Sequence, residues 1–177
     1  VYNEINTLEI IIKKLVNLKL YKDVIKEVII IDDFSTDGSA EIIKQYGDSF
    51  DYIKTYFKKA NKGKGDSQKI AKQFVTGDYV IIQDADLEYD PEDINKLLQI
   101  AIDEKRDFVI GHRIMKTTIK HPYFFFRELA VNSLTLLLNV LYGTSIKDCA
   151  CCYRLFTSDL WRNIDGKADE FEYDFSI

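Results

Sequence analysis

Two carboxylates with one residue between them are the clearest chemical signal in the chain. Asp84-Ala85-Asp86 comes directly after the apolar run Tyr79 to Ile82. In extended backbone alternate side chains share a face, so both carboxylates can converge on one cation. Mg²⁺ or Mn²⁺ is commonly held by one or two carboxylates together with substrate phosphates. The spacing therefore predicts an Mg²⁺ or Mn²⁺ site for a diphosphate, against the alternative of a turn whose Asp side chains bind local backbone.

Three further polar clusters are expected beside this pair. Asp32-Asp33 follows the apolar run Val28 to Ile31, Gly111-His112-Arg113 follows Phe108 to Ile110, and Tyr2-Asn3-Glu4 precedes a helix. In open parallel sheets, ligands bind beyond the carboxyl ends of the strands. The N-terminal cluster would reach the same edge if residues ahead of Val1 formed one more strand. We therefore expect a fragment that lacks its first strand and any C-terminal extension.

A glycine- and lysine-containing loop, Asn61 to Gly65, is expected ahead of a helix marked by Ile70 and Phe74. Its Gly and Lys offsets match neither a P-loop nor a dinucleotide-binding fingerprint. With Lys64 entering the helix, the loop is a candidate to approach a diphosphate. The alternative is an ordinary flexible turn.

The elements that position these residues alternate between strand and helix. Strands are expected at 28–31, 52–56, 79–82, 108–110 and 153–156, with helices near 8–18, 42–46, 70–74, 94–101 and 122–141. This alternation predicts a single α/β domain over residues 1–177, with a mostly parallel central sheet and helices on both faces. The longest apolar stretch, Leu134 to Tyr142, is too short to span a bilayer.

Composition narrows the class of partner. The 177 residues include 24 Lys and Arg against 29 Asp and Glu, a formal net charge of -5, which indicates no general attraction to nucleic acid. Cys149, Cys151 and Cys152 fit no disulfide framework or zinc spacing and are expected to be free, mostly buried thiols in a cytoplasmic protein. His112 and His121 are possible third metal ligands, but structural or solvated roles are favoured. The sequence leaves the oligomeric state open.

Five segments in the same order resemble family 2 glycosyltransferases of the dolichyl-phosphate mannose/glucose synthase-like branch. The segments are Tyr2 to Glu4, Ile30 to Ser39, Asn61 to Gly65, Gly77 to Pro91 and Asp148 to Phe156. The resemblance implies a GT-A fold and a nucleotide-diphosphate-sugar donor of the UDP-glucose or GDP-mannose type. One departure lies at Phe34, where the family usually has Gly.

The resemblance also implies roles for individual residues. Asp84 and Asp86 match the metal-binding DXD pair, with Ala85 between them in the donor site, and Glu88 stands where relatives often have a metal-binding Gln. The positions that match those holding base and ribose are Tyr2, Glu4, Ile31 and Asp33. The basic residues that resemble those engaging donor and acceptor phosphates are Arg113 and Arg127.

We expect a metal-dependent inverting transfer of a hexose to a polyprenyl or dolichyl phosphate. Because that acceptor oxygen is already anionic, the reaction needs no strong general base. The alternatives are transfer to a saccharide hydroxyl, with Asp148 as candidate base, and a nucleotide-sugar-binding domain without turnover. A capping role for Asp148 is at least as well supported.

The aromatic residues Tyr123 to Phe126, ahead of Leu129 to Leu141, suit a membrane interface that receives a lipid acceptor. Such an interface would place the protein peripherally at, or anchored to, the cytoplasmic face of a membrane. The alternative is a helix packed on the sheet with its aromatic side chains in the core.

Overall fold

The computed structural model describes residues 1–112 and 122–164 of the chain. Its helices are α1 (Leu8–Asn17), α2 (Ser39–Ser49), α3 (Gly63–Ala71), α4 (Ile94–Asp103), α5 (Pro122–Tyr142) and α6 (Ser158–Asn163), with 3-10 turns η1 (Tyr21–Asp23) and η2 (Pro91–Asp93). Its strands are β1 (Val28–Asp32), β2 (Ile53–Phe57), β3 (Tyr79–Ile81), β4 (Phe108–Ile110) and β5 (Arg154–Thr157). The predicted alternation of strands and helices is therefore confirmed as far as α4 and β4.

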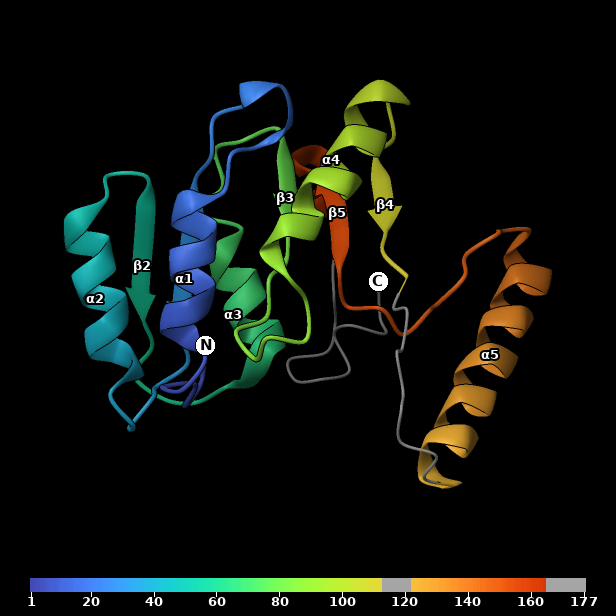
Figure 1. Ribbon diagram of the computed structural model, residues 1–177, viewed down its shortest axis with the longest axis horizontal. Helices are drawn as coiled ribbons and strands as arrows, with labels where there is room; N and C mark the ends of the chain where they lie inside the picture. Colours follow the sequence, from blue (N-terminus) through green and yellow to red (C-terminus); the bar gives the residue numbers. More distant parts are fainter. Residues whose placement is uncertain (113–121, 165–177) are drawn as a thin grey trace.

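The strands pair as one parallel and one antiparallel group. β1 and β2 run parallel, with Val28 opposite Ile53, and β3 and β4 each pair antiparallel with β5, which lies between them. Figure 1 shows β2, β3, β5 and β4 in that order across the molecule. Because β3 and β4 both run against β5, these two share a direction, and within this three-stranded group only β5 runs the other way.

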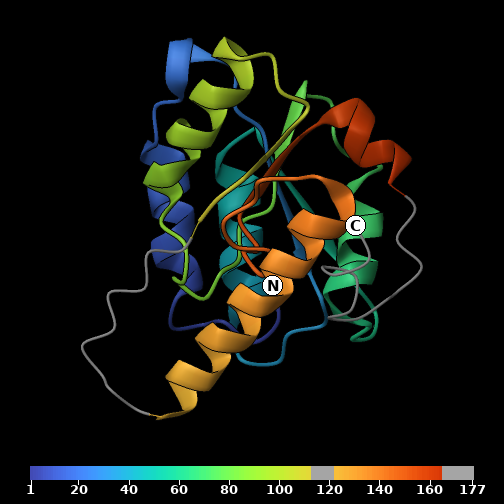
Figure 2. The same cartoon turned by 90° about the vertical axis from the view of Figure 1, so that its right-hand side faces the viewer.

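Helices cover both faces of the strands, as the sequence predicts. In Figure 2, α1 and α4 (blue and lime) lie on one side, and α3 and α6 (green and red) lie on the other. The helix periodicity explains this arrangement for α1 and α4, because their buried residues recur at helical spacing on one face. Those residues are Leu8, Ile11 and Ile12 of α1, and Ile94, Leu97, Leu98 and Ala101 of α4.

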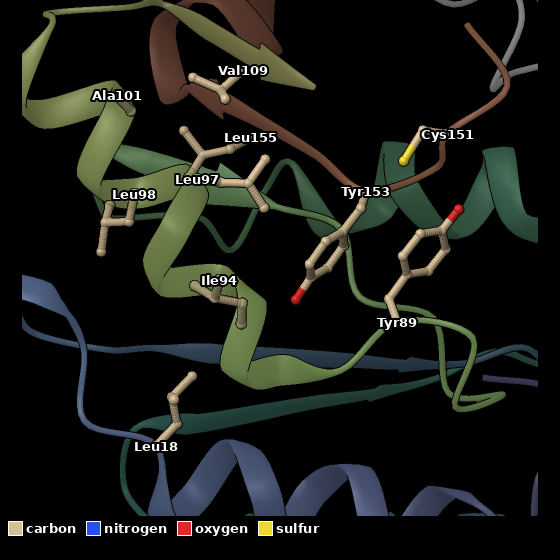
Figure 3. Packing of buried hydrophobic residues seen from close by; sticks show 10 residues of the cluster. All are labelled: Leu18, Tyr89, Ile94, Leu97, Leu98, Ala101, Val109, Cys151, Tyr153 and Leu155. Carbon is tan, nitrogen blue, oxygen red and sulfur yellow. The ribbon is translucent and has the colours of Figure 1, made fainter. Parts of the chain in front are cut away.

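Two apolar clusters form the core beneath these helices. One joins α1, β1, α2 and β2 through Leu8, Ile12, Ile30, Ile43 and Ile53. The other packs α4 against β4 and β5, and it also holds the rings of Tyr89 and Tyr153 (Figure 3). The second cluster lies directly under the chain that follows β3, so it supports the segment carrying the candidate metal ligands.

Helix α5 lies apart from the strands in Figure 1, and in Figure 2, which looks at that side, it crosses in front of the rest of the molecule. Large apolar side chains on it are exposed, among them Phe126, Leu136, Val140 and Leu141. Phe126 therefore does not take the core position that the alternative gives to the aromatic side chains, and the side chains of Tyr123, Phe124 and Phe125 lie outside the described part of the chain. Among the residues described, no helix combines the length and apolar character needed to cross a bilayer.

Glu27 connects the two groups of strands. Its carboxylate accepts hydrogen bonds from the backbone N–H groups of Thr76 at 2.7 Å and Gly77 at 3.0 Å, and from Lys54 Nζ at 2.7 Å. Burial alone raises the pKa of Glu27, but these hydrogen bonds outweigh it and lower the pKa from 4.5 to about 2. The ionised form of Glu27 therefore stabilises the folded chain.

The substitution Glu27→Gln is expected to lower the free energy of unfolding by about 2–3 kcal/mol near neutral pH. A carboxyl whose pKa is depressed by folding stabilises the fold above its ordinary pKa, and this contribution is lost as the pH falls from about 5 to about 2. Urea denaturation at a series of pH values checks this, with Glu41→Gln on the exposed surface of α2 as the control. A gap between wild type and Glu27→Gln that stays constant with pH would contradict the assignment.

Candidate functional site

Asp84 lies just beyond the carboxyl end of β3 and binds a cation supplied by the chain itself. Its Oδ1 and Oδ2 lie 2.9 and 3.2 Å from Lys64 Nζ, and both side chains are 24% exposed. Lys64 belongs to the first turn of α3, which reaches this edge from behind the strands (Figure 1). The structure thus brings together two predicted site residues that are separated by 20 positions in the sequence.

Asp86 and Glu88 lie in an exposed turn after Asp84. Asp86 Oδ1 accepts a hydrogen bond from the backbone N–H of Glu88 at 2.9 Å, and Leu87 between them has a left-handed φ of 66°. Across residues 1–112 and 122–164, no three His, Cys, Asp or Glu side chains are arranged to hold a metal. Glu88 therefore does not complete a ready-made three-carboxylate site, and its role as a ligand stays a prediction.

The carboxylate oxygens of Asp84 and Asp86 are nevertheless suitable ligands for a divalent ion. Carboxylate oxygens are the ligands that Mg²⁺ and Mn²⁺ take, and Asp84 already accommodates the positive charge of Lys64. Asp84 and Asp86 would hold such an ion, and oxygens of a bound diphosphate would complete its coordination.

Asp33 anchors the segment that carries Lys64. Its carboxylate accepts the backbone N–H groups of Lys62 at 2.9 Å and Gly63 at 2.8 Å, and it pairs with Lys58 Nζ at 2.6 Å. The carboxylate thus satisfies N–H groups at the start of α3, although Asp33 lies directly after β1, about 30 positions earlier in the chain. This explains why α3 begins at Gly63, so the prediction that 61–65 is a loop is wrong for residues 63–65.

The N-terminal cluster lies at the predicted edge. The backbone of Val1 bonds to Ile31 and Asp33, which brings Tyr2 and Glu4 to the carboxyl end of β1. Tyr2 is 48% exposed, Glu4 is partly buried and accepts a hydrogen bond from the Thr7 hydroxyl, and Ile31 is buried. Their contacts with base and ribose stay predictions.

Polar side chains tie the turn after β1 to the N-terminal segment. Thr36 N–H donates to Asn3 Oδ1 at 2.8 Å, and Ile5 N–H donates to Asp37 Oδ2 at 3.0 Å. A hydrogen bond from the Ser39 hydroxyl lowers the pKa of Asp37. Phe34 takes a left-handed φ of 68°, which explains why Gly suits this position in the family pattern that the sequence resembles.

A partly buried polar network that includes the backbone of Asp84 was not anticipated from the sequence. Tyr153 donates its hydroxyl hydrogen to Gln83 Oε1 at 2.9 Å, and Gln83 Nε2 donates to the backbone oxygens of Asp84 and Tyr89. The two tyrosine rings stack 5.0 Å apart (Figure 3), and burial raises the pKa of both hydroxyls, so they stay protonated. The network fixes the backbone around Asp84. The one feature of the sequence that could have suggested this network is the amide side chain of Gln83 directly before Asp84.

Asp148 is buried and caps a turn. Its Oδ1 accepts the backbone N–H of Ala150 at 3.0 Å, the capping role that the sequence allowed. Whether it also serves as a base stays a prediction. Cys149, Cys151 and Cys152 are not joined by a disulfide, and of the three only Cys151 is fully buried.

Several predicted residues lie partly or wholly outside the described part of the chain. Arg113 and His121 fall between residues 112 and 122, and the side chain of Arg127 in α5 is likewise not described. His112 is described and exposed. The assignment of Arg113 and Arg127 to phosphate binding therefore stays a prediction.

Comparison with known proteins identifies the family. The model of glycosyl transferase family 2 matches residues 1–164. The low-salt glycan biosynthesis hexosyltransferase Agl6 of Haloferax volcanii is 30% identical over 146 residues, covering 82% of this chain and 34% of that protein. The undecaprenyl-phosphate 4-deoxy-4-formamido-L-arabinose transferase of Pectobacterium carotovorum is 29% identical over 160 residues, covering 88% of this chain and 46% of the relative. The chain thus spans a third to a half of the length of these relatives.

Solved structures agree on the fold. The mannosyltransferase PcManGT from Pyrobaculum calidifontis, solved with GDP-Man and Mn²⁺, matches with a TM-score of 0.61 and 20% identity over 99% of this chain and 48% of that one. The predicted GT-A fold is therefore confirmed. Together with the family match over residues 1–164, these findings place the chain in glycosyl transferase family 2.

Proposed function

We propose that this chain is the donor-binding domain of a metal-dependent inverting glycosyltransferase that moves a hexose from a nucleotide-diphosphate sugar to a polyprenyl phosphate. The observation that carries the proposal is the placement of Asp84 just beyond the end of β3, with Asp86 two residues later. Asp84 already pairs there with the ammonium of Lys64. An edge of this kind is where open α/β sheets bind ligands.

The relatives support the choice of donor and acceptor. One is named a hexosyltransferase, another is named for undecaprenyl phosphate, and the mannosyltransferase structure holds GDP-Man with Mn²⁺. These properties belong to those proteins, and we extend them to this chain because the family match covers 164 of its 177 residues.

The mechanism follows from the charges that change during transfer. A divalent ion at Asp84 and Asp86 would neutralise charge on the departing diphosphate. Lys64, on the first turn of α3, contacts Asp84 and would stabilise the same phosphates electrostatically. Because the phosphate oxygen of the acceptor is already anionic, Asp148 can keep its turn-capping role, and a single displacement inverts the anomeric carbon.

The exposed apolar side chains of helix α5 support the proposal of a lipid acceptor. The helix exposes Leu136, Val140 and Leu141 beside Tyr142, at 65%, 73%, 65% and 74%. Apolar and aromatic side chains on an exposed helix favour the boundary between lipid headgroups and acyl chains. We propose that α5 lies on the cytoplasmic face of a membrane, where the polyprenyl phosphate is presented, and that Arg113 and Arg127 bind its phosphate.

Acceptor choice is tested with labelled nucleotide sugar and the full-length protein. We expect label to appear in polyprenyl phosphate and not in the matched polyprenol, since only the phosphate offers an anionic nucleophile. UDP-glucose and GDP-mannose are supplied in parallel, and extraction into organic solvent separates the product. Label in an added oligosaccharide would instead favour transfer to a hydroxyl, and no transfer to any acceptor would favour a binding domain without turnover.

A further inference from the structure

The ammonium of Lys64 is paired with the Asp84 carboxylate, which a divalent ion would also need. The ammonium contacts both oxygens of Asp84, at 2.9 and 3.2 Å. A divalent ion bound to a carboxylate lies about 2.1 Å from its oxygen, with water or phosphate oxygens filling the rest of its shell. An ammonium held against both oxygens blocks that approach and repels the incoming charge. Metal and Lys64 therefore compete for Asp84.

The backbone just before Lys64 is held in place by Asp33. Asp33 binds the backbone N–H groups of Lys62 and Gly63, and this fixes the first turn of α3 immediately before Lys64. The side chain beyond that fixed backbone is a flexible four-carbon stem. Its ammonium can thus change partners while α3 stays in place.

We propose that Lys64 is an exchangeable counter-cation for Asp84, an inference that rests on the proposed function. In the empty site Lys64 neutralises Asp84. When a nucleoside diphosphate arrives with its metal ion, the metal takes Asp84 and Lys64 moves onto the diphosphate. Metal binding then depends on the nucleotide, because phosphate oxygens offer Lys64 a partner that draws its ammonium away from Asp84.

This exchange has a signature that a fixed structural ion pair lacks. Removing the charge of Lys64 takes away a cation that competes for Asp84 in the empty protein, so Mn²⁺ alone binds more tightly. Removing it also deletes a partner of the diphosphate, so Mn²⁺ binds more weakly when nucleotide is present. The same substitution thus has opposite effects in the two states.

The test compares Lys64→Met with Lys62→Met, which removes one exposed lysine charge from the same segment. Free Mn²⁺ is followed by its electron paramagnetic resonance signal during titration of each protein, first alone and then with UDP or GDP. For Lys64→Met we expect a Kd for Mn²⁺ about tenfold lower without nucleotide and about tenfold higher with it. Lys62→Met is expected to match wild type in both states.

A Kd for Mn²⁺ that is equal in wild type and Lys64→Met without nucleotide would overturn the exchange. So would an equal shift in Lys62→Met, because the effect would then be general electrostatics. Neither titration contains sugar or lipid. If the Mn²⁺ titrations show the exchange but no sugar is transferred to polyprenyl phosphate, the proposed acceptor is wrong and the role of Lys64 stands. If sugar is transferred but the titrations show no exchange, the role of Lys64 is wrong and the proposed function stands.

Discussion

The substitution Asp86→Asn is expected to lower kcat/KM for sugar transfer by about 10³-fold, equivalent to about 4 kcal/mol of transition-state stabilisation. Asn keeps the oxygen that accepts the Glu88 N–H, so the turn is preserved and only the charge is lost. With one carboxylate left, Asp84, the site would hold a divalent ion weakly, and the departing diphosphate would lose its main source of neutralisation. Steady-state kinetics at saturating Mn²⁺, with calorimetric titration of UDP or GDP, measures both effects.

The matched control is Glu92→Gln, which removes an exposed acidic charge from the same stretch of chain. It is expected to leave kcat/KM within about twofold of wild type, and both variants should unfold at the wild-type temperature, since surface changes of this kind cost little. A variant Asp86→Asn that keeps Mn²⁺-dependent transfer would move the metal away from the predicted pair. The parallel substitution Glu88→Gln asks whether Glu88 also binds the ion.

The placement of Asp84 was predictable because each step depends on local pattern. The apolar run of β3 ends at a polar residue, and parallel strands bring such ends to one edge, so Asp33 and Asp84 were expected at the same edge of the sheet. The structure bears this out through α3, whose start is bound by Asp33 and whose Lys64 is bound by Asp84. The reversed direction of β5 was not predictable, because a strand of four residues carries no signal for its direction.

Contacts between segments that are distant in the sequence could not be predicted from local sequence patterns. Lys58 appears as the first of two adjacent lysines after β2, a pattern typical of a solvated surface, yet its side chain is 3% exposed. The early start of α3 has the same origin, since its N–H groups are satisfied by a carboxylate about 30 positions away. Helix α5 shows the reverse, because its apolar residues indicate burial but lie exposed. Pattern alone does not distinguish a protein core from a lipid surface.

Lys58 holds three segments of the site together. Its Nζ lies 2.6 Å from Asp33 Oδ1 and 2.6 Å from Asp66 Oδ2, and its backbone N–H bonds to the backbone oxygen of Asp32. One ammonium therefore neutralises a carboxylate from the end of β1 and another from α3. Without it, two mostly buried carboxylates would face each other with no cation between them, and water would have limited access to either.

The substitution Lys58→Met is accordingly expected to lower the free energy of unfolding by about 3–5 kcal/mol, the cost of leaving buried charge uncompensated. Lys13→Met removes the exposed partner of Glu9 on α1 and is expected to leave the free energy of unfolding almost unchanged, because surface ion pairs contribute little. Denaturant unfolding of both variants at neutral pH makes the comparison. Adding Asp66→Asn to Lys58→Met should recover part of the loss by removing one of the two facing charges. A cost for Lys58→Met no larger than that for Lys13→Met would show that the buried ion pairs do not hold β1 to α3.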